Sequence, residues 1–263
     1  MRTKMIQILF LLAVVSALAG PVAAGEYQLI LGKGTEVCEA CLKNLQQQPV
    51  EDAVCDRQYA AGLELSAPEW KSLDLHEHTE FYKRVAKLVD DGNELSKNAD
   101  FDDSKIFKEF LETTVKINRA SMAMAHIDIN NDGKLEWVLQ YRGGNCRKEF
   151  HGYPGFYQSV LLVLADDRRT IDYAKTDLLV QHLFQGVKYR IGIPHFQLYQ
   201  VFAYKGTVYF DKWNGGGGDK EDPITLKLDQ PDINTLSVYR VNKNQTNKVC
   251  QIRLFPPDIA PHN

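Results

Sequence analysis

Oxygen-bearing side chains gather around a glycine in residues 127–138, IDINNDGKLEWV. Numbered from Asp128, they fall at positions 1, 3, 5 and 9, and Gly133 lies at position 6. Calcium in proteins is bound by six to eight oxygens, and a glycine permits the sharp turn that gathers them. Carboxylates this close together repel one another unless a cation lies between them. The spacing therefore favours a calcium site.

The same residues resemble the calcium loops of EF-hands, dockerins and the FG-GAP repeats of integrin-like propellers, which share Asp-x-Asp/Asn-x-Asp-Gly. The stretch departs from the EF-hand because position 12 is Leu139 instead of glutamate and because its flanks predict strands. The acid at position 9, Glu136, has the FG-GAP spacing. The resemblance implies a ligand set of Asp128, Asn130, Asp132, the Lys134 carbonyl and Glu136. It covers about a dozen residues and implies no fold for the rest of the chain.

A metal-free hairpin is the alternative for this loop. Asn and Asp side chains can cap their own backbone, and Asp-Gly alone suffices for a tight turn. The additional acids Asp128 and Glu136 would not be needed for such a turn, so we expect calcium, with a structural role.

Five cysteines occur in the chain, at positions 38, 41, 55, 146 and 250. In an oxidising compartment thiols pair, and an odd number leaves at least one over. Thr35 is a suitable helix N-cap, so TEVCEACLKNL predicts a helix on which Cys38 and Cys41 share the apolar face. We expect Cys38–Cys55 and Cys146–Cys250 bridges with Cys41 as a buried thiol, although spacing alone leaves the connectivity open.

The Cys38-Glu-Ala-Cys41 motif also raises a redox alternative. A strand, a glycine-containing loop and Cys-x-x-Cys in the first turn of a helix is the thioredoxin arrangement, in which the helix dipole lowers a thiol pKa. No alternation of strands and helices follows, and Cys55 lies close by. We therefore expect structural cysteines, with a thiol-disulfide oxidoreductase as the alternative.

Other candidates for catalysis are weaker. The side chains of His76 and His78 would point in different directions on a helix, because they are two residues apart. We therefore expect one surface and one core histidine, and no pair of metal ligands. Cys146 and His151 lie in a glycine-rich loop, but a secreted cysteine is more often bridged than nucleophilic. The glycines in NGGGGDKED, from Asn214, lack the Lys-Ser/Thr and helix of a phosphate-binding loop. We assign no catalytic residue.

The first 24 residues have the order of a secretory signal peptide. Arg2 and Lys4 precede an apolar run of about 15 residues, and small residues lead to an expected cleavage after Ala24. The run is shorter than the roughly 20 residues that cross a bilayer, and no later segment approaches that length. We expect a periplasmic or secreted protein without membrane insertion.

The charge balance limits the partners. Without Arg2 and Lys4, 29 basic groups remain against 34 acidic groups, a formal charge of −5. Mild acidity without a basic block argues against nucleic acid as the main partner. We expect the partner to be a protein or an envelope component.

Hydrophobic periodicity divides the mature chain into two parts. Residues 25–114 predict amphipathic helices, among them one with an Asp74 cap and one beginning near Asp103. Residues 115–263 alternate with a period of two, and their short connections predict antiparallel strands. The expected fold is α+β, with N-terminal helices packed on a C-terminal antiparallel sheet.

The whole-chain pattern resembles that of secreted bacterial proteins from families without an assigned activity, through VCEACLKNL, APEW, DINNDGKLEW and VYFDKW. The resemblance implies export and no particular chemistry. We expect a non-catalytic, envelope-associated binding protein with a structural calcium loop. The alternatives are the oxidoreductase and an envelope hydrolase.

Overall fold

The computed structural model describes residues 26–90, 103–116, 120–144, 146, 158–179, 195–216 and 234–255. The expected signal peptide, His151 and most of NGGGGDKED lie outside these residues. Within them, no helix combines the length and the apolar character needed to cross a bilayer.

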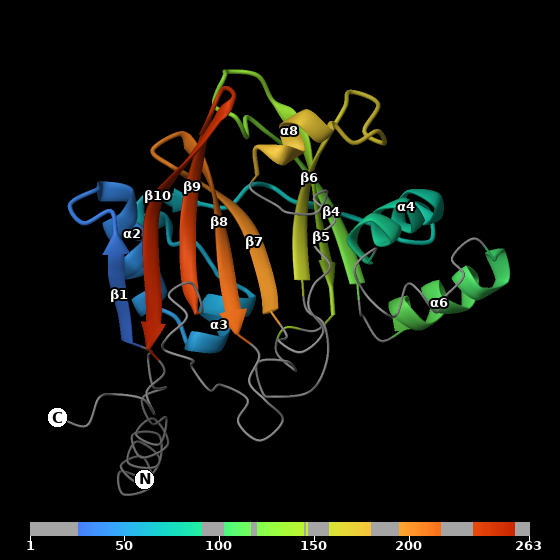
Figure 1. Ribbon diagram of the computed structural model, residues 1–263, viewed down its shortest axis with the longest axis horizontal. Coiled ribbons are helices and arrows are strands. Elements are labelled where there is room, and N and C mark those ends of the chain that lie inside the picture. Colours follow the sequence, from blue (N-terminus) through green and yellow to red (C-terminus); the bar gives the residue numbers. More distant parts are fainter. Residues whose placement is uncertain are drawn as a thin grey trace, which may run out of the picture.

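One ten-stranded sheet dominates the fold, with the spatial order β1-β10-β9-β8-β7-β6-β5-β4-β3, and β2 pairs with β7 beside this path (Figure 1). The strands are β1 (Glu26–Leu31), β2 (Leu65–Ser66), β3 (Lys71–Leu73), β4 (Ala120–Ile127), β5 (Glu136–Gly143), β6 (Gln158–Leu164), β7 (His195–Tyr204), β8 (Thr207–Gly216), β9 (Thr235–Asn242) and β10 (Gln245–Phe255). All neighbours are antiparallel except β6 and β7, which are parallel.

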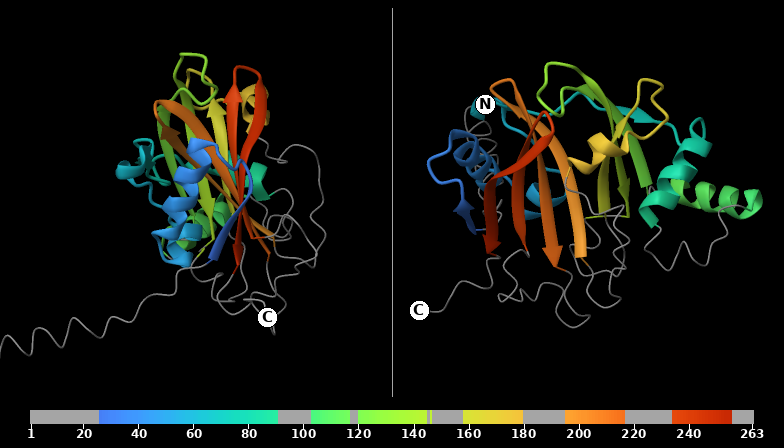
Figure 2. Two further views of the ribbon diagram at one scale, coloured as in Figure 1. Left: turned by 90° about the vertical axis from the view of Figure 1, so that its left-hand side faces the viewer. Right: turned by 45° about the horizontal axis from the view of Figure 1, so that its top comes forward.

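Helices lie near both ends of the sheet. The first group is α2 (Glu36–Gln46), α3 (Val50–Cys55) and the 3-10 helix η1 (Ala61–Leu63); α2 packs on β1 and β10, whereas α3 lies nearer β7 and β8 (Figures 1 and 2). The second group is α4 (Thr79–Asp90) and α6 (Ser104–Lys116), beside the β4 end (Figure 1). The short helix α8 (Tyr173–Asp177) lies on the opposite face from α2 (Figure 2).

Local sequence explains where these helices begin. The Asp103 carboxylate accepts hydrogen bonds from the Lys105 and Ile106 amides and so caps α6. Asp74 accepts hydrogen bonds from the His76 and Glu77 amides in the same way, but α4 begins only at Thr79, one turn later than expected. Thr35 has the extended backbone of an N-cap before α2, without a side-chain hydrogen bond.

Three hydrophobic clusters fill the interior. The first joins α2 and α3 to β7–β10 and β1, with Leu45, Phe202 and Trp213 at its centre. The second joins α4 and α6 to β4–β6, around Tyr82 and Leu139. The third joins β5 and β6 to β7 and β8, so it connects the two ends of the sheet.

The edge of β7 that faces β6 is divided among several partners. Gln197 pairs with Gln158 of β6, whereas Ala203 and Tyr204 pair with β2. Between them, the Tyr199 amide donates to Ser159 Oγ at 2.6 Å, and Gln140 Nε2 donates to the Tyr199 carbonyl at 2.9 Å. At this point side chains make the hydrogen bonds that a neighbouring backbone would make in a regular sheet, because β6 and β7 diverge.

The expected combination of helices with a large, mostly antiparallel sheet is confirmed. The expected segregation is only partly seen, since β1, β2 and β3 come from residues 25–114 and join the same sheet, and α8 comes from residues 115–263. Tyr27 and Leu29 of β1 are buried against the first cluster, which gives this N-terminal strand a hydrophobic reason to pair with β10.

Candidate functional site

Four of the five expected calcium ligands lie in the loop between β4 and β5, and the fifth, Glu136, is the first residue of β5. Asp128 accepts hydrogen bonds from the backbone amides of Asp132 and Gly133, both at 2.9 Å. Asp132 accepts from the Lys134 amide at 2.9 Å and from Asn130 Nδ2 at 3.1 Å. The Lys134 amide is the main reason that the pKa of Asp132 lies below its usual value. Asp128, Asn130 and Asp132 are therefore brought together.

Two residues of the loop have left-handed backbone. Gly133 has φ +88°, which suits a residue without a Cβ, and Asn131 has φ +54°, which asparagine tolerates better than most residues. These two conformations turn the chain sharply enough for Asp128 to reach the amides four and five residues ahead.

Glu136 is held differently from the other acids. Its carboxylate is almost fully buried and accepts from the Ile129 amide at 3.3 Å and from Lys175 Nζ of α8 at 3.0 Å. The hydrogen bond to Glu136 is the main cause that raises the pKa of Lys175. An ammonium group of the protein itself thus partly balances the negative charge of this loop.

The donor types of the loop suit calcium, and carboxylate oxygens retain acceptor capacity beyond the hydrogen bonds described. Within the described part of the chain, however, no three His, Cys, Asp or Glu side chains converge as a ready-made metal site. Full coordination by the expected ligands would require Glu136 to turn from Lys175 toward the aspartates.

Asn131 was not among the expected site residues, yet it fixes the loop to the rest of the sheet. Its Nδ2 donates to the carbonyls of Val208 and Val241 at 3.0 and 2.8 Å, and its Oδ1 accepts from the Val208 amide at 2.9 Å. The Lys243 amide donates to the Asn130 carbonyl at 2.8 Å. Figure 1 shows the loop beside the β9–β10 hairpin at the top of the sheet. No short-range sequence signal predicts these contacts, because the partners lie 77 and 110 residues away.

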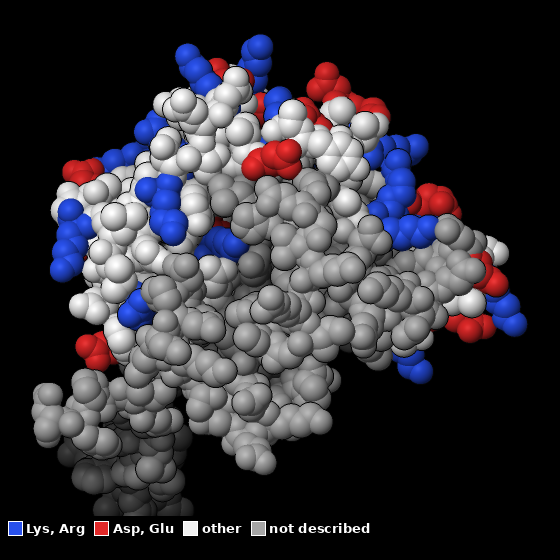
Figure 3. Space-filling view, viewed as in Figure 1, with Lys and Arg blue, Asp and Glu red and all other residues white. Residues whose placement is uncertain are grey.

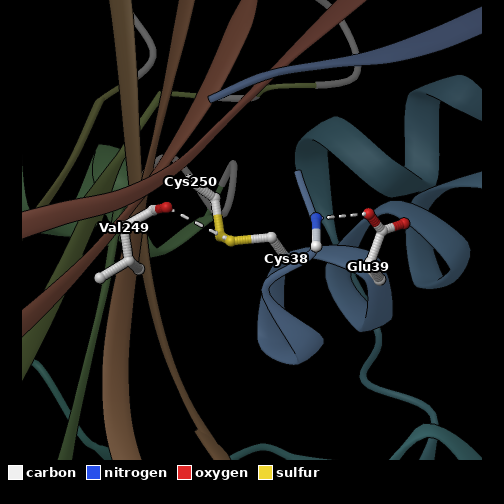
Figure 4. The surroundings of a disulfide bond; sticks show 5 residues. Cys38, Glu39, Val249 and Cys250 are labelled. Carbon is white, nitrogen blue, oxygen red and sulfur yellow. Dashed lines mark hydrogen bonds between the residues drawn. A yellow bond between two sulfur atoms is a disulfide. The ribbon is translucent and has the colours of Figure 1, made fainter. Parts of the chain in front are cut away.

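The cysteines form two disulfide bonds with a connectivity that differs from the expected one. Cys38 of α2 is bonded to Cys250 of β10, and Cys55 of α3 is bonded to Cys146 beyond β5. The expected pairs Cys38–Cys55 and Cys146–Cys250 are therefore wrong. Sequence proximity suggested Cys55 as the partner of Cys38, whereas α2 packs directly on β10 and brings Cys250 to it (Figure 4).

Cys41 is the remaining free thiol, as expected, and it is buried. Burial raises its pKa to about 12, with a further contribution from the negative charge of Asp211. Cys38, its partner in the Cys-x-x-Cys motif, is already bonded across the core to β10. The motif thus has neither an exposed disulfide of its own nor a thiol that ionises at neutral pH.

A buried polar cluster lies beneath α3. The Arg57 guanidinium makes a two-pronged contact with the Asp211 carboxylate, and Tyr59 donates to the same carboxylate at 2.8 Å. Arg57 and Asp211 side chains are each 1% exposed. Burial raises the pKa of Asp211 while Arg57 opposes the shift. Arg57 also donates to the Ala53 carbonyl, so this cluster joins the end of α3 to β8.

The histidines of the His76-Glu77-His78 stretch lie in the turn that precedes α4, where His76 is exposed and His78 is half-buried. A cleft of about 410 Å³ lies elsewhere on the surface, between α2, η1 and the β7–β8 turn. Its charged groups are largely paired within the protein, since Lys205 Nζ lies 2.9 Å from Glu36 and 3.3 Å from Glu64.

Comparison with known proteins identifies no relative, since no family model, curated protein or solved structure matches the chain. Two disulfide bonds are compatible with an extracellular or periplasmic location.

Proposed function

We propose that this chain is an exported, non-catalytic binding protein of the cell envelope, in which residues 128–136 hold a structural calcium ion. The observation that carries the calcium proposal is the arrangement of Asp128, Asn130 and Asp132 around the left-handed turn at Gly133. The side-chain oxygens of Asp128 and Asn130 both accept from the Asp132 amide, and the Asp132 side chain is exposed to solvent.

Export is supported by the order of charged, apolar and small residues in positions 1–24 and by the two disulfide bonds. The alternative of a thiol-disulfide oxidoreductase has less support, because the Cys41 thiol is buried and its pKa is about 12. The alternative of an envelope hydrolase would need two convergent carboxylates outside residues 128–136. The partner that we propose is another protein or an envelope component.

Calcium would act on this loop mainly by charge. It would draw the Asp128 and Asp132 carboxylates together, and Glu136 would complete the shell only by leaving Lys175. Sites of this kind in exported proteins bind with dissociation constants of roughly 10⁻⁴ to 10⁻³ M. Bound calcium would hold the loop in the conformation in which Asn131 contacts β8 and β9.

A calcium titration tests this proposal. In 5 to 10 mM calcium, on the order of tenfold above the expected dissociation constant, the melting temperature should rise by a few degrees relative to protein in chelator. The Asp128→Asn/Asp132→Asn variant should lose this rise, and Asp166→Asn, in a different turn, should keep it. If neither calcium nor chelator changes the melting temperature, and calorimetry detects no calcium binding, the calcium proposal is wrong. Lys175 would then be the positive charge that balances the loop.

A further inference from the structure

A stacked aromatic pair on β4 and β5 lies beside a turn that carries Arg168 and Arg169, and Arg84 of α4 contacts the same turn. The Trp137 ring of β5 lies parallel to the imidazole of His126 on β4, with 4.4 Å between the ring centroids. The Arg168 guanidinium lies over the same tryptophan at 4.0 Å from its centroid. His126 and Arg168 are exposed and Trp137 is half-buried, so the stack lies at the surface.

A second arginine reaches the same place from a helix. Arg84 of α4 donates from Nη2 to the Arg169 carbonyl at 3.3 Å, and its guanidinium carbon lies 5.6 Å from the centroid of Phe81. This contact brings Arg84 to the turn that carries Arg168 and Arg169. Figure 3 shows Lys and Arg side chains gathering over the region of α4.

Asp167 of this turn binds mainly hydroxyl and backbone groups, which are the main causes of its lowered pKa, and the charge of Arg169 is a minor cause. Asp167 accepts hydrogen bonds from the Arg169 amide, the Thr170 amide and the Thr170 hydroxyl, at 2.8, 2.7 and 2.5 Å. Its carboxylate is thus engaged in shaping the turn. Among the described residues, no carboxylate forms a salt bridge with Arg84, Arg168 or Arg169. The guanidinium groups of Arg84 and Arg168 are therefore available to bind an anion.

The backbone also holds Arg168 in an unusual position. Arg168 has φ +58°, a left-handed conformation that costs a residue with a Cβ about 1 kcal/mol or more. The hydrogen bonds Ala165 N–H to Thr170 O and Arg168 N–H to Ala165 O keep the turn in this shape. The turn therefore presents Arg168 over Trp137 at an energetic cost.

We propose that Arg84, Arg168 and Arg169 form a binding site for a phosphate group, with His126 and Trp137 as its aromatic wall. Guanidinium groups form paired hydrogen bonds with phosphate oxygens, and stacking on an aromatic ring fixes the plane of the guanidinium before the ligand arrives. A phosphate group has more oxygens and more negative charge than a carboxylate, so it can engage several arginines at once. The phosphate belongs to a free phosphate compound or to a lipid headgroup.

Calorimetric titration with pyrophosphate, and with acetate as the control anion, tests the site. Pyrophosphate should bind and acetate should not, and binding should weaken as sodium chloride increases. The Arg84→Gln/Arg168→Gln variant should bind at least about tenfold more weakly, since each lost charge-assisted pair accounts for roughly that factor. The affinity of Arg168→Lys for pyrophosphate should lie between those of the unmodified protein and the double variant. Lysine keeps the positive charge but loses the paired N–H donors of the guanidinium.

The control variant is Lys105→Gln/Lys108→Gln, which removes two exposed positive charges near the start of a different helix, α6. It should bind pyrophosphate as the unmodified protein does. If Arg84→Gln/Arg168→Gln fails to fold, Arg84→Gln/Arg169→Gln removes two of the three proposed charges while Arg168 still covers Trp137, and it should also weaken pyrophosphate binding.

Co-sedimentation with vesicles separates the two sources of phosphate. Binding to phosphatidylglycerol vesicles but not to phosphatidylcholine vesicles, lost in the arginine variant, assigns a lipid headgroup. Binding of pyrophosphate without vesicle binding assigns a free phosphate compound. Absence of both, equal binding of acetate, or an equal loss in the lysine control overturns the proposal.

Discussion

Single residues in this protein differ in chemistry because their surroundings differ. Cys38 and Cys41 are three positions apart on one face of α2, yet Cys38 is bonded to β10 and Cys41 is a thiol. Asp132 at the surface and Asp211 in the interior have pKa values shifted in opposite directions, downward by backbone hydrogen bonding and upward by burial. Residue type alone therefore does not define reactivity here.

The reactivity of Cys41 gives a prediction at this scale. A thiol whose pKa is about 12 is protonated at pH 7, and alkylation requires the thiolate. Native, unreduced protein should therefore show almost no alkylated cysteine at pH 7 to 8, and denatured protein should show one. Mass spectrometry after iodoacetamide treatment measures both. Two rapidly alkylated thiols after mild reduction of native protein would instead favour the oxidoreductase alternative.

At the scale of elements, the β4–β5 loop joins strands of the sheet as well as carrying the proposed calcium site. The Asn131 side chain bonds backbone groups of β8 and β9 that do not pair with each other at this point. The side chains of Gln140 and Ser159 bond the backbone of Tyr199 in β7 in the same way. Buried backbone groups need partners, and side chains supply them where strands diverge. The loop is therefore part of the junction between β5 and the β8–β9 pair.

Replacement of Asn131 tests this junction. Asn131→Ala removes three hydrogen bonds and leaves the Val208 amide without this partner, so the free energy of unfolding should fall by about 2–3 kcal/mol. Asn131→Gly loses the same hydrogen bonds, but its stability should exceed that of Asn131→Ala by about 1 kcal/mol, because glycine adopts the positive φ without strain. Urea denaturation measures both changes. Equal stability of Asn131→Ala and the unmodified protein would contradict the assigned role.

At the scale of the whole molecule, two disulfides connect different layers. Cys38–Cys250 ties α2 to the sheet across 212 residues of sequence, and Cys55–Cys146 ties α3 to the far end of β5 across 91 residues. The Arg57–Asp211 pair reinforces the second connection, because both residues are buried between α3 and β8. Each bridge therefore restrains a distinct helix.

Removal of each disulfide separately tests this division. The Cys38→Ser/Cys250→Ser and Cys55→Ser/Cys146→Ser variants should each lose about 2–5 kcal/mol of stability. Amide hydrogen exchange should rise mainly in α2 and β1 for the first and mainly in α3 and the end of β5 for the second. The same exchange pattern in both variants would show that the bridges do not act locally.

The sequence alone determined what depends on neighbours in the chain. The periods of α2, α6 and most strands, the Asp103 cap and the turn at Gly133 follow from contacts within a few residues. The oxygen-rich loop was recognisable for the same reason. These features need only local hydrogen bonds and alternating burial, which a linear pattern records.

Tertiary structure decided which distant residues meet. Four contacts join separate segments: the pairing of Cys38 with Cys250, the entry of β1 at the edge of the sheet, the contact of Lys175 with Glu136, and the hydrogen bond from Arg84 to the Arg169 carbonyl. Such contacts arise from the packing of apolar faces over the whole molecule, because burial is rewarded wherever complementary surfaces meet and does not depend on separation along the chain.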